Sequence, residues 1–458
     1  MDFDTLIRDA QRALQRAVGA LDLSYDPTPL PSLTPAAAAR RCRDIEEALA
    51  DISGPTYAAV RALKVLDEDS PVVAALLAQH EACRLRGKVL QAAGPPTDGG
   101  PTHPRVGTRG GHRPGRAPGG DYRIVSPYHA RVLAALDVAH LSAAVGFPRH
   151  TAVWGPAFIG KTECARIHMA HYRHTSTTRT VAHERAGSVL VTTKPVVAFE
   201  TPAEVRPKAF MRAALEALGD PAPSAGSTDA LANRLCERSA EGGVRLLVID
   251  DINHTVERGD DSVSVDTRRT ARSVYVMATT LRDLLAQLEF KNATTSVVIM
   301  GVNSGQELLN CNGQLQSRFS QIALERLGFD PTHLEDALVF LSIVRSTLRA
   351  LPLTVDSEMQ SFSGACRLHY ATGGNVCALA DLLAMAVRLA NVLGEALTWT
   401  HLRRALDQAP WAQAMRHRRL VAGVSDANPF TKHGVPLDAP EGTCRSLAEM
   451  FRAAAGDA

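Results

Sequence analysis

The chain has 458 residues, enough for about three domains on length alone, and its formal net charge of +2 identifies no class of partner. Apolar residues make up 45% of it and aromatic residues only 5%, so we expect a core of Ala, Leu and Val. The eight cysteines are scattered with no C-x-x-C pair, which argues against a zinc site or a disulfide framework and favours a reducing cytoplasm. No basic-then-apolar leader opens the sequence and no apolar run approaches about 20 residues, so we expect neither a signal peptide nor a membrane span.

Residues 1–93 are predicted to form an all-helical N-terminal domain. Apolar residues recur at helical spacings over 6–21, and similar patterns predict helices over about 34–52, 56–66 and 71–90. The segment carries no catalytic pattern. We interpret it as an adaptor that serves interaction or oligomerisation.

Residues 94–120 are predicted to be a disordered linker. Pro and Gly dominate the segment, and its arginines have no acidic neighbour before Asp121. Such a composition cannot bury enough apolar surface to fold. Two interpretations stay open, namely a flexible basic arm on nucleic acid or a solvated tether.

From 121 to about 350 the sequence alternates short apolar runs with helical patterns, which is typical of a parallel α/β sheet. The predicted strands are 152–155, 196–200, 245–250, 296–302 and 321–324. The predicted helices are 127–144, 160–172, 207–218, 227–241, 270–289 and 333–349. A helical segment over 351–420 and a tail over 421–458 complete the chain.

The first predicted strand is followed by a phosphate-binding loop. Gly155 to Thr162 fits the pattern G-x-x-x-x-G-K-[ST] at every fixed position, between a strand and a helix as the pattern requires. Gly155 and Gly160 let the backbone curl so that N–H groups face phosphate oxygens, and the helix N-terminus adds partial positive charge. Lys161 supplies a charge for the β- and γ-phosphates, and the Thr162 hydroxyl is placed to ligate Mg²⁺. We assign ATP binding to Gly155, Pro156, Ala157, Phe158, Ile159, Gly160, Lys161, Thr162 and Glu163.

Carboxylates and an amide follow later strands. The apolar run 246–249 ends in Asp250 and Asp251, and a carboxylate at such a strand tip completes the Mg²⁺ shell of a P-loop site. We expect Asp250 to be the metal ligand and Asp251 to orient or deprotonate the attacking water. Asn303 ends the next predicted strand, where it could position that water or contact the γ-phosphate. A turn Asn that caps the strand is the alternative.

Arg318 comes just before the last predicted strand. We expect it on the surface beside the nucleotide edge of the sheet, where it suits an arginine finger that reaches the γ-phosphate of the next subunit. A solvated surface Arg is the alternative.

These elements, in this order, resemble the AAA+ ATPases and, more narrowly, the TniB/TnsC family of DNA-transposition ATPases. Besides the P-loop, the resemblance rests on blocks at 195–202, 210–221, 244–254, 314–319 and 373–398, and it covers about 122–405. It implies a P-loop fold with a five-stranded parallel sheet, flanking helices and a helical lid. It also implies Mg-dependent ATP hydrolysis in a homo-oligomeric ring or filament on DNA, in which Arg318 of one subunit completes the site of the next.

Three features depart from the family pattern. The second carboxylate is Asp251 where the family usually has Glu, and the shorter side chain is expected to slow hydrolysis or to require further closure of the site. The segment 257–273 looks longer than the usual loop, and no Arg lies near 373–379, where many AAA+ proteins carry a second sensor. Residues 1–93 and the linker lie outside the resemblance.

A basic segment between the P-loop helix and the second strand is the candidate DNA-binding region. Its cations include Arg173, Arg179, Arg185 and Lys194, interleaved with Ser and Thr, which favours contacts to the phosphate backbone over base reading. In the resembling family this region faces DNA. A solvated basic surface is the alternative. A second candidate is the arginine group at 416–419.

The resemblance implies a regulator of transposition that assembles on double-stranded DNA with ATP, recruits or activates a transposase, and disassembles on hydrolysis. A target-selection protein is a further candidate partner. Two alternatives stay open: a nucleotide-gated scaffold in signalling or phage defence, and a replication initiator or helicase loader. The latter would be expected to carry a winged-helix domain, for which the residues after 420 look too short. Tyr128 and His129 are weak candidates for adenine contacts.

Overall fold

The structure of the protein, a computed structural model, describes residues 35–53, 71–92, 126–172, 178–183, 187–202, 206–255, 267–291, 293–329, 334–351, 353–413 and 428–431. Several sequence-based expectations fall outside these residues. They are the helices at 6–21 and 56–66, the linker at 94–120, Arg173, Arg185, the arginines at 416–419 and nearly all of the tail.

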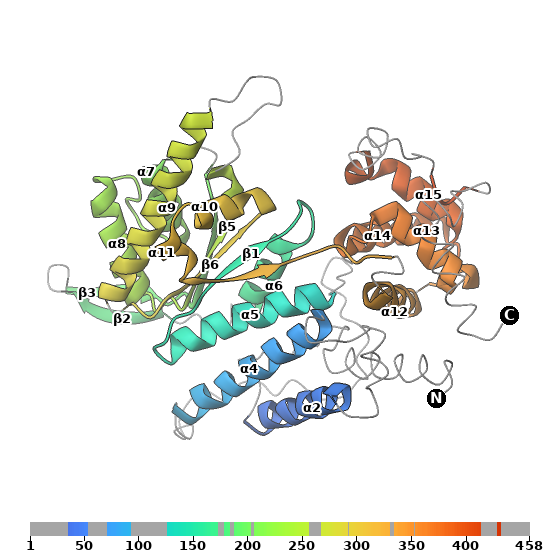
Figure 1. Cartoon of the computed structure of the whole chain (residues 1–458), viewed down its shortest axis with the longest axis horizontal. Coiled ribbons are helices and arrows are strands. Elements are labelled where there is room, and N and C mark those ends of the chain that lie inside the picture. Colours follow the sequence, from blue (N-terminus) through green and yellow to red (C-terminus); the bar gives the residue numbers. More distant parts are fainter. Residues whose placement is uncertain are drawn as a thin grey trace.

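Five strands form one parallel sheet in the order β4-β5-β6-β1-β7 (Figure 1). They are β1 (His150–Trp154), β4 (Val196–Glu200), β5 (Leu246–Asp250), β6 (Ser296–Gly301) and β7 (Phe319–Ala323). Because every pair is parallel, the strands end at one edge, and the loops that follow them meet there. β1, β5 and β6 are buried along their whole length, as expected for a sheet with helices on both faces.

Helices cover the two faces and make a three-layered core. They are α5 (Pro127–Ala144), α6 (Lys161–Tyr172), α7 (Pro207–Leu218), α8 (Thr228–Glu241) and α9 (Thr267–Phe290). Successive side chains of a strand point to opposite faces. Leu247 and Ile249 of β5 therefore pack in the core with α7, α8 and α9, whereas Leu246 and Val248 pack with α5 and α6. The predicted fold class is confirmed.

The predicted strands and helices lie where the sequence places them. The helices at 127–144 and 207–218 match residue for residue, and the other elements within the described residues differ at each end by three residues or fewer. Short elements complete the core and lid: η4 (Ile252–Thr255), η5 (Asn303–Gln306), α10 (Glu307–Asn310), α11 (Gly313–Gln316) and η7 (Ser357–Gln360).

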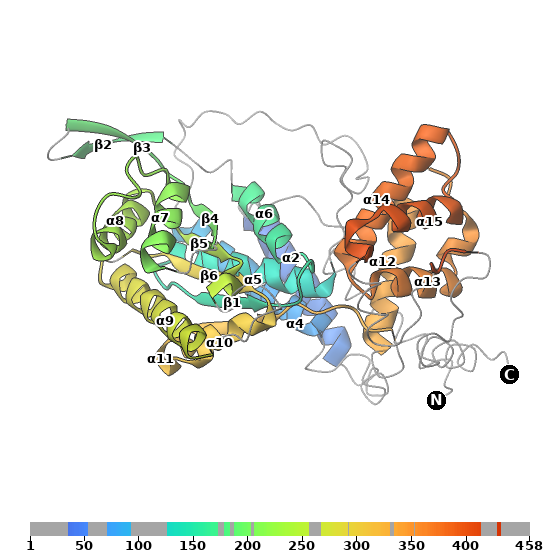
Figure 2. The ribbon, with the colours of Figure 1, turned by 90° about the horizontal axis from the view of Figure 1, so that it is seen from above.

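A two-stranded hairpin stands apart from the main sheet. Its antiparallel strands, β2 (Thr178–His183) and β3 (Gly187–Thr192), form a sheet of their own between α6 and β4 in the sequence. The hairpin extends beyond α8 at the β4 end of the sheet (Figure 2). The backbone of this part of the predicted DNA-binding segment therefore lies apart from the five-stranded sheet.

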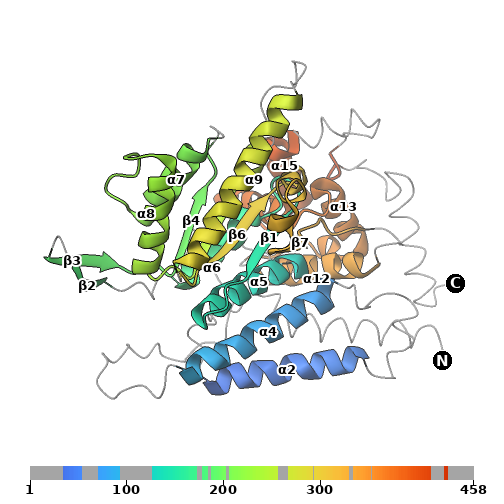
Figure 3. The ribbon, with the colours of Figure 1, turned by 60° about the vertical axis from the view of Figure 1, so that its left-hand side comes forward.

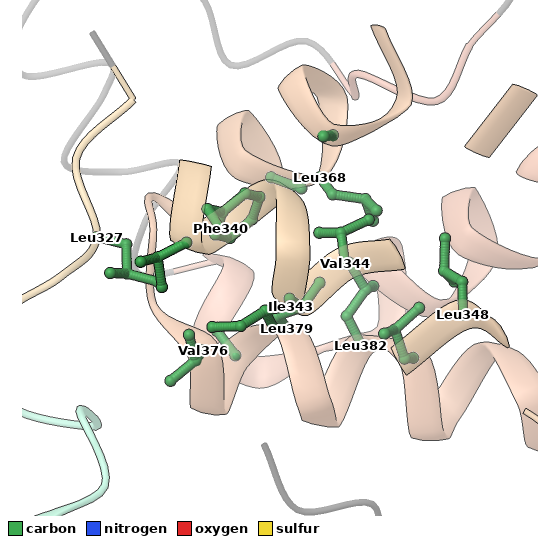
Figure 4. Packing of buried hydrophobic residues seen from close by; sticks show 14 of the residues in the cluster. Leu327, Phe340, Ile343, Val344, Leu348, Leu368, Val376, Leu379 and Leu382 are labelled. Atoms are coloured by element: carbon green, nitrogen blue, oxygen red, sulfur yellow. The ribbon is translucent and has the colours of Figure 1, made fainter. Parts of the chain in front are cut away.

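The lid is a helical body whose core includes α12 (Leu334–Ala350), α13 (Phe362–Thr372), α14 (Val376–Leu393) and α15 (Trp399–Gln408). Phe340 and Val344 of α12 pack with Leu368 of α13 and Leu379 of α14 (Figure 4). α12, which comes before the predicted boundary at 351, therefore shares a core with α13, α14 and α15, and the boundary itself stays a prediction. The sequence pattern shows that α12 is amphipathic but not which core its apolar face joins.

One helix of the described residues, α14, has the length and apolarity of a membrane span. Half of that stretch is buried inside the protein, with Leu379, Leu382 and Leu383 in the lid core. This packing accounts for its apolar composition as that of a core helix.

The N-terminal helices α2 (Pro35–Ser53) and α4 (Pro71–Ala92) pack on each other, and α4 lies along α5 (Figure 3). Ile45 of α2 and Leu76 of α4 are fully buried. Glu81 of α4 also pairs with Arg149, just before β1, at 3.5 Å. These helices therefore form a further layer on the α5 side, and an independent N-terminal domain stays a prediction.

We expect Leu76→Ala to lower the free energy of unfolding by about 2–5 kcal/mol, because it leaves a cavity in the layer between α4 and its neighbours. The matched control is Leu77→Ala, which trims a side chain that is 52% exposed and should change stability by less than about 0.5 kcal/mol. Urea unfolding followed by circular dichroism measures both. If Leu76→Ala shifts only an early, separate transition, the N-terminal helices unfold independently of the core.

Candidate active site

The P-loop follows β1, and both of its glycines are required by close approaches. A Cβ on Gly155 would lie 2.3 Å from the carbonyl oxygen of Leu324. Gly160 has φ +103° and a Cβ there would lie 2.6 Å from Nε2 of His129. No other residue fits either position without displacing a neighbour.

Phe158 at the tip of the loop adopts a left-handed backbone conformation with φ +67°. A bulky residue in this region is strained. Its side chain is 68% exposed. The curl of the loop is thus achieved with Phe158 in a conformation that glycine would adopt more readily.

Lys161 is the first residue of α6, and its ammonium lies inside the loop. Nζ donates hydrogen bonds of 2.8 Å to the carbonyl oxygens of Gly155 and Pro156, and the side chain is buried. Burial lowers the pKa of Lys161, and the nearby carboxylates of Asp250 and Asp251 oppose that change. The three charges therefore belong to one site.

Asp250 ends β5 and is buried. Burial raises its pKa, and a hydrogen bond from the Thr162 hydroxyl lowers it. Thr162 and Asp250, far apart in the sequence, are therefore in direct contact through oxygen atoms. A hydroxyl and a buried carboxylate that share one space are a donor set that fits Mg²⁺, a cation that prefers oxygen ligands.

The second carboxylate follows directly. The backbone N–H of Asp251 donates to Oδ1 of Asp250 at 2.9 Å, and Asp251 itself is left-handed with φ +52°. Strained residues of this kind gather at functional sites. The sharp turn at Asp251 ends the strand and begins η4 at the edge where the P-loop lies.

Asn303 is exposed at the start of η5, directly after β6. Because β6 lies between β5 and β1, Asn303 shares the loop edge with Asp250 and the P-loop. The turn is fixed by Trp154, the last residue of β1: a Cβ on Gly305 would lie 2.8 Å from its ring. The sequence therefore places Asn303 on the correct edge, and its role stays a prediction.

Arg318 lies elsewhere than expected. It precedes Phe319, which pairs with His150 at the start of β1, whereas the P-loop follows the end of β1. Arg318 is thus at the opposite edge of the sheet, roughly 15 Å from the P-loop at the usual rise per residue. There Nη1 pairs with Oε1 of Glu289 in α9 at 2.9 Å. The expected place beside the nucleotide edge is wrong, because a residue before a parallel strand lies at the edge where that strand begins.

Comparison with known families completes this description. Residues 124–329 match the family described as Bacterial TniB protein. This match confirms the predicted resemblance to the TniB/TnsC family, and the order of the five parallel strands agrees with the predicted AAA+ P-loop fold. The TniB-matching region runs from the segment before α5 to the segment after β7. The lid and the N-terminal helices lie outside it.

Solved structures similar to this chain include those of ORC1, CDC6P and ORC2 proteins. The Aeropyrum pernix ORC1 protein in complex with DNA is 17% identical, with 65% of this chain and 68% of that chain covered and a TM-score of 0.38. CDC6P from Pyrobaculum aerophilum is 17% identical, with coverages of 63% and 69% and a TM-score of 0.41. The Aeropyrum pernix ORC2 protein in ADPNP-ADP complexes is 11% identical, with coverages of 73% and 89% and a TM-score of 0.43. No curated protein matches the sequence.

The predicted DNA contacts are only partly described. Arg179 lies in β2 of the hairpin, while Arg173 and Arg185 are outside the described residues. Lys194 Nζ donates to the carbonyl oxygens of Ala217 and Leu218 at 3.1 and 3.4 Å, at the C-terminal end of α7. Lys194 therefore has a structural partner, and its contact with DNA stays a prediction.

His129 and Tyr128, weak candidates for adenine contacts, both have partners within the protein. Nε2 of His129 lies 2.7 Å from the carbonyl oxygen of Ile159 in the P-loop. Its Nδ1 accepts from the backbone N–H of Ser126 at 3.4 Å, which leaves Nε2 as the N–H donor to the loop. The hydroxyl of Tyr128 donates to the Asp336 carboxylate of α12. The Ser126–His129 capping box at the start of α5 was a signal that sequence reasoning missed.

The neutral state of His129 predicts a pH dependence of stability. Burial lowers its pKa from 6.5 to about 4, against a hydrogen bond to the Ile159 carbonyl that raises it. The unfolded chain therefore takes up a proton before the folded chain does. The contribution of neutral His129 to the free energy of unfolding is therefore fully present above about pH 6.5. It is lost as the pH falls toward 4, by up to about 3 kcal/mol.

Urea unfolding at several pH values between 7 and 4.5 tests this expectation. His129→Gln, which offers an uncharged amide, should flatten the decline. His150→Gln is the companion variant: burial also lowers the pKa of His150 to about 4, so this variant should flatten the decline by a similar amount. Equal pH profiles for wild type and His129→Gln, with His150→Gln flatter than both, would assign the effect to His150 instead.

Proposed function

We propose that this chain is an ATP-dependent, DNA-binding regulator of transposition. The observation that carries the nucleotide part is the contact of Thr162 with the buried Asp250 beside Lys161, at the mouth of a P-loop. The observation that carries the transposition part is the match of residues 124–329 to the TniB family. Hydrolysis of ATP to ADP and phosphate is the proposed reaction.

The residues of the site divide the work of binding and catalysis. Lys161 and the N–H groups of the loop hold the β- and γ-phosphates. Thr162 and Asp250 would hold Mg²⁺, which when bound neutralises charge on the phosphates. Asp251 orients the attacking water or accepts its proton, and Asn303 positions that water.

Arg318 acts on a neighbouring subunit in this proposal. Its place at the opposite edge of the sheet puts it out of reach of the phosphates of its own chain. Its side chain is 33% exposed, so it is accessible at the surface. A homo-oligomeric ring or filament would bring Arg318 to the γ-phosphate of the next subunit, where it completes the site.

The oligomer assembles on double-stranded DNA with ATP bound, through the hairpin and the basic residues around it. Contacts to the phosphate backbone make this binding independent of sequence. The assembled form recruits or activates a transposase, and hydrolysis dissolves the assembly. The free thiols of all seven cysteines in the described residues support a reducing, cytoplasmic setting.

Arg318→Ala should reduce the ATP turnover rate of the assembled protein by at least about a hundredfold, with nucleotide binding unchanged, because the arginine acts only on the transition state. Phosphate release is measured across a range of protein concentrations. Arg282→Ala is the matched control, since Arg282 also pairs with a carboxylate on α9, Asp283, at 2.7 Å.

Mixing tests the action between subunits. Arg318→Ala subunits retain an intact P-loop, and Lys161→Ala subunits retain Arg318. Mixed oligomers should therefore recover part of the activity that neither variant has alone. Full turnover by Arg318→Ala at concentrations where wild type is assembled would show that no arginine finger operates at this position.

Binding of labelled, non-specific duplex DNA tests the DNA part, with and without a slowly hydrolysed ATP analogue. Wild type should bind only with the analogue, and binding should weaken steeply with salt. Lys161→Ala and Arg318→Ala should lose it. The triple Ala variant at Arg173, Arg179 and Arg185 should lower the slope of log affinity against log salt by about 3.

The control for that triple variant is the double Ala variant at Arg403 and Arg404, which are exposed on α15. It removes charge from the lid and should leave the salt slope unchanged. If wild type hydrolyses ATP but never holds DNA at low salt, the transposition proposal fails. A nucleotide-gated protein scaffold then becomes the better account.

A further inference from the structure

The Asn375 side chain of the lid contacts the P-loop directly. Nδ2 of Asn375, just before α14, donates a hydrogen bond of 3.0 Å to the carbonyl oxygen of Phe158. Oδ1 of Asn375 accepts from the backbone N–H groups of Cys377 and Ala378 at 2.9 and 3.2 Å and so caps the helix. Asn375 is buried, and both ends of its amide are used. It is therefore a bridge between two bodies of the protein.

The hydrogen bond has a direct effect on the phosphate-binding groups. In a planar trans peptide the C=O and the next N–H point in opposite directions. When Asn375 holds the Phe158 oxygen on the lid side of the loop, the N–H of Ile159 faces the other side. His129 holds the Ile159 oxygen in the same way at 2.7 Å and so orients the N–H of Gly160. Two consecutive amides at the tip of the loop are oriented from outside.

Phe158 is the weak point of this arrangement. Its left-handed backbone, φ +67°, is unfavourable for a side chain with a Cβ. A loop that carries this strain needs partners to hold it. His129 belongs to α5 in the core, while Asn375 caps α14 of the lid. The lid also supplies Cys377, whose Sγ lies 3.5 Å from the Ile159 oxygen. The contacts from Asn375 and Cys377 can therefore change when the lid moves, and only that from Asn375 reaches the strained Phe158.

The N-terminus of α14 is in turn fastened to the chain that leaves β7. The N–H of Leu327 donates to the carbonyl oxygen of Gly374 at 3.0 Å, and His369 Nε2 lies 2.9 Å from the Leu327 oxygen. A Cβ on Gly374 would lie 1.9 Å from that same oxygen. The position of Asn375 is therefore set by the packing of the lid on this segment.

We propose that Asn375 is a positioning residue that couples the lid to nucleotide binding through the backbone of the P-loop. Its amide orients the Phe158–Ile159 peptide so that the Ile159 N–H faces the phosphates, and displacement of the lid releases that peptide. The lid acts here on the loop, where no arginine near 373–379 is present to act on the phosphate. The proposal rests on the nucleotide site proposed above.

Asn375→Asp is the discriminating variant, because it retains the oxygen that caps α14 and replaces the N–H₂ donor with a second acceptor opposite the Phe158 oxygen. We expect it to weaken binding of a fluorescent ATP analogue about tenfold. Asn375→Ser is the second variant, in case the Asp variant does not fold. Ser is a good N-cap residue but lacks the amide donor, and it should weaken binding in the same direction.

Two controls separate positioning from a loss of lid stability. Ser361 caps α13, accepting from Gly364 at 3.1 Å, and has no part in the loop. Ser361→Ala should lower the thermal midpoint without weakening nucleotide binding. Phe158→Gly should rescue nucleotide binding, because glycine adopts positive φ readily. In that background Asn375→Asp should weaken binding of the ATP analogue by less than about threefold.

The outcomes are distinct. Weakened binding in Asn375→Asp, rescued by Phe158→Gly and absent in Ser361→Ala, supports the coupling. Wild-type affinity in folded Asn375→Asp or Asn375→Ser, while Lys161→Ala loses binding, overturns the coupling and leaves the nucleotide site intact. Absence of nucleotide binding by the wild-type protein overturns both.

Discussion

The site depends on opposite charges that are buried together at the carboxyl edge of the sheet. Lys161 and Asp250 are both buried. Burial lowers the pKa of Lys161 and raises the pKa of Asp250, so it favours the neutral form of both groups, and the charge of each residue opposes this shift in the other. Removal of one member of such a pair leaves an uncompensated charge and costs about 3–5 kcal/mol. Layers of helices on both faces of the sheet exclude the water that would otherwise solvate these groups. The three-layered fold therefore strengthens the electrostatic interaction between the two charges.

Much of this arrangement could be predicted because its signals are local. The P-loop pattern between a strand and a helix, and an apolar run that ends in Asp250, define the site without any tertiary information. The helix 207–218 is delimited by Pro207 in its first turn and by Gly219, which adopts φ +82°. These start and stop signals explain why the sequence predicts that helix residue for residue.

The contacts that hold the loop in place could not be predicted in the same way. Asn375 lies 217 residues after Phe158, and His129 lies 30 residues before Ile159. A lone Asn or His has no periodicity that reveals its partner. The same limit applies to α12: its apolar stripe can be seen in the sequence, but the core that this stripe joins cannot. It also applies to Arg318, because the sheet edge at which Arg318 lies is set by the pairing of Phe319 with His150. Pairing, rather than propensity, decides these positions.

The strained Phe158 gives the lid a thermodynamic role. If docking of Asn375 favours the loop conformation that binds phosphate, then bound nucleotide must favour docking of the lid by the same free energy, because binding couplings are reciprocal. With glycine at position 158 this coupling free energy would be small, since the loop would adopt its phosphate-binding conformation without the hydrogen bond from Asn375. The packing of α12 in the lid core and the hydrogen bond from Tyr128 to Asp336 extend the connection from the lid to α5. α5 in turn carries the N-terminal helices through α4. The lid, α5 and the N-terminal helices are therefore joined by a continuous set of contacts.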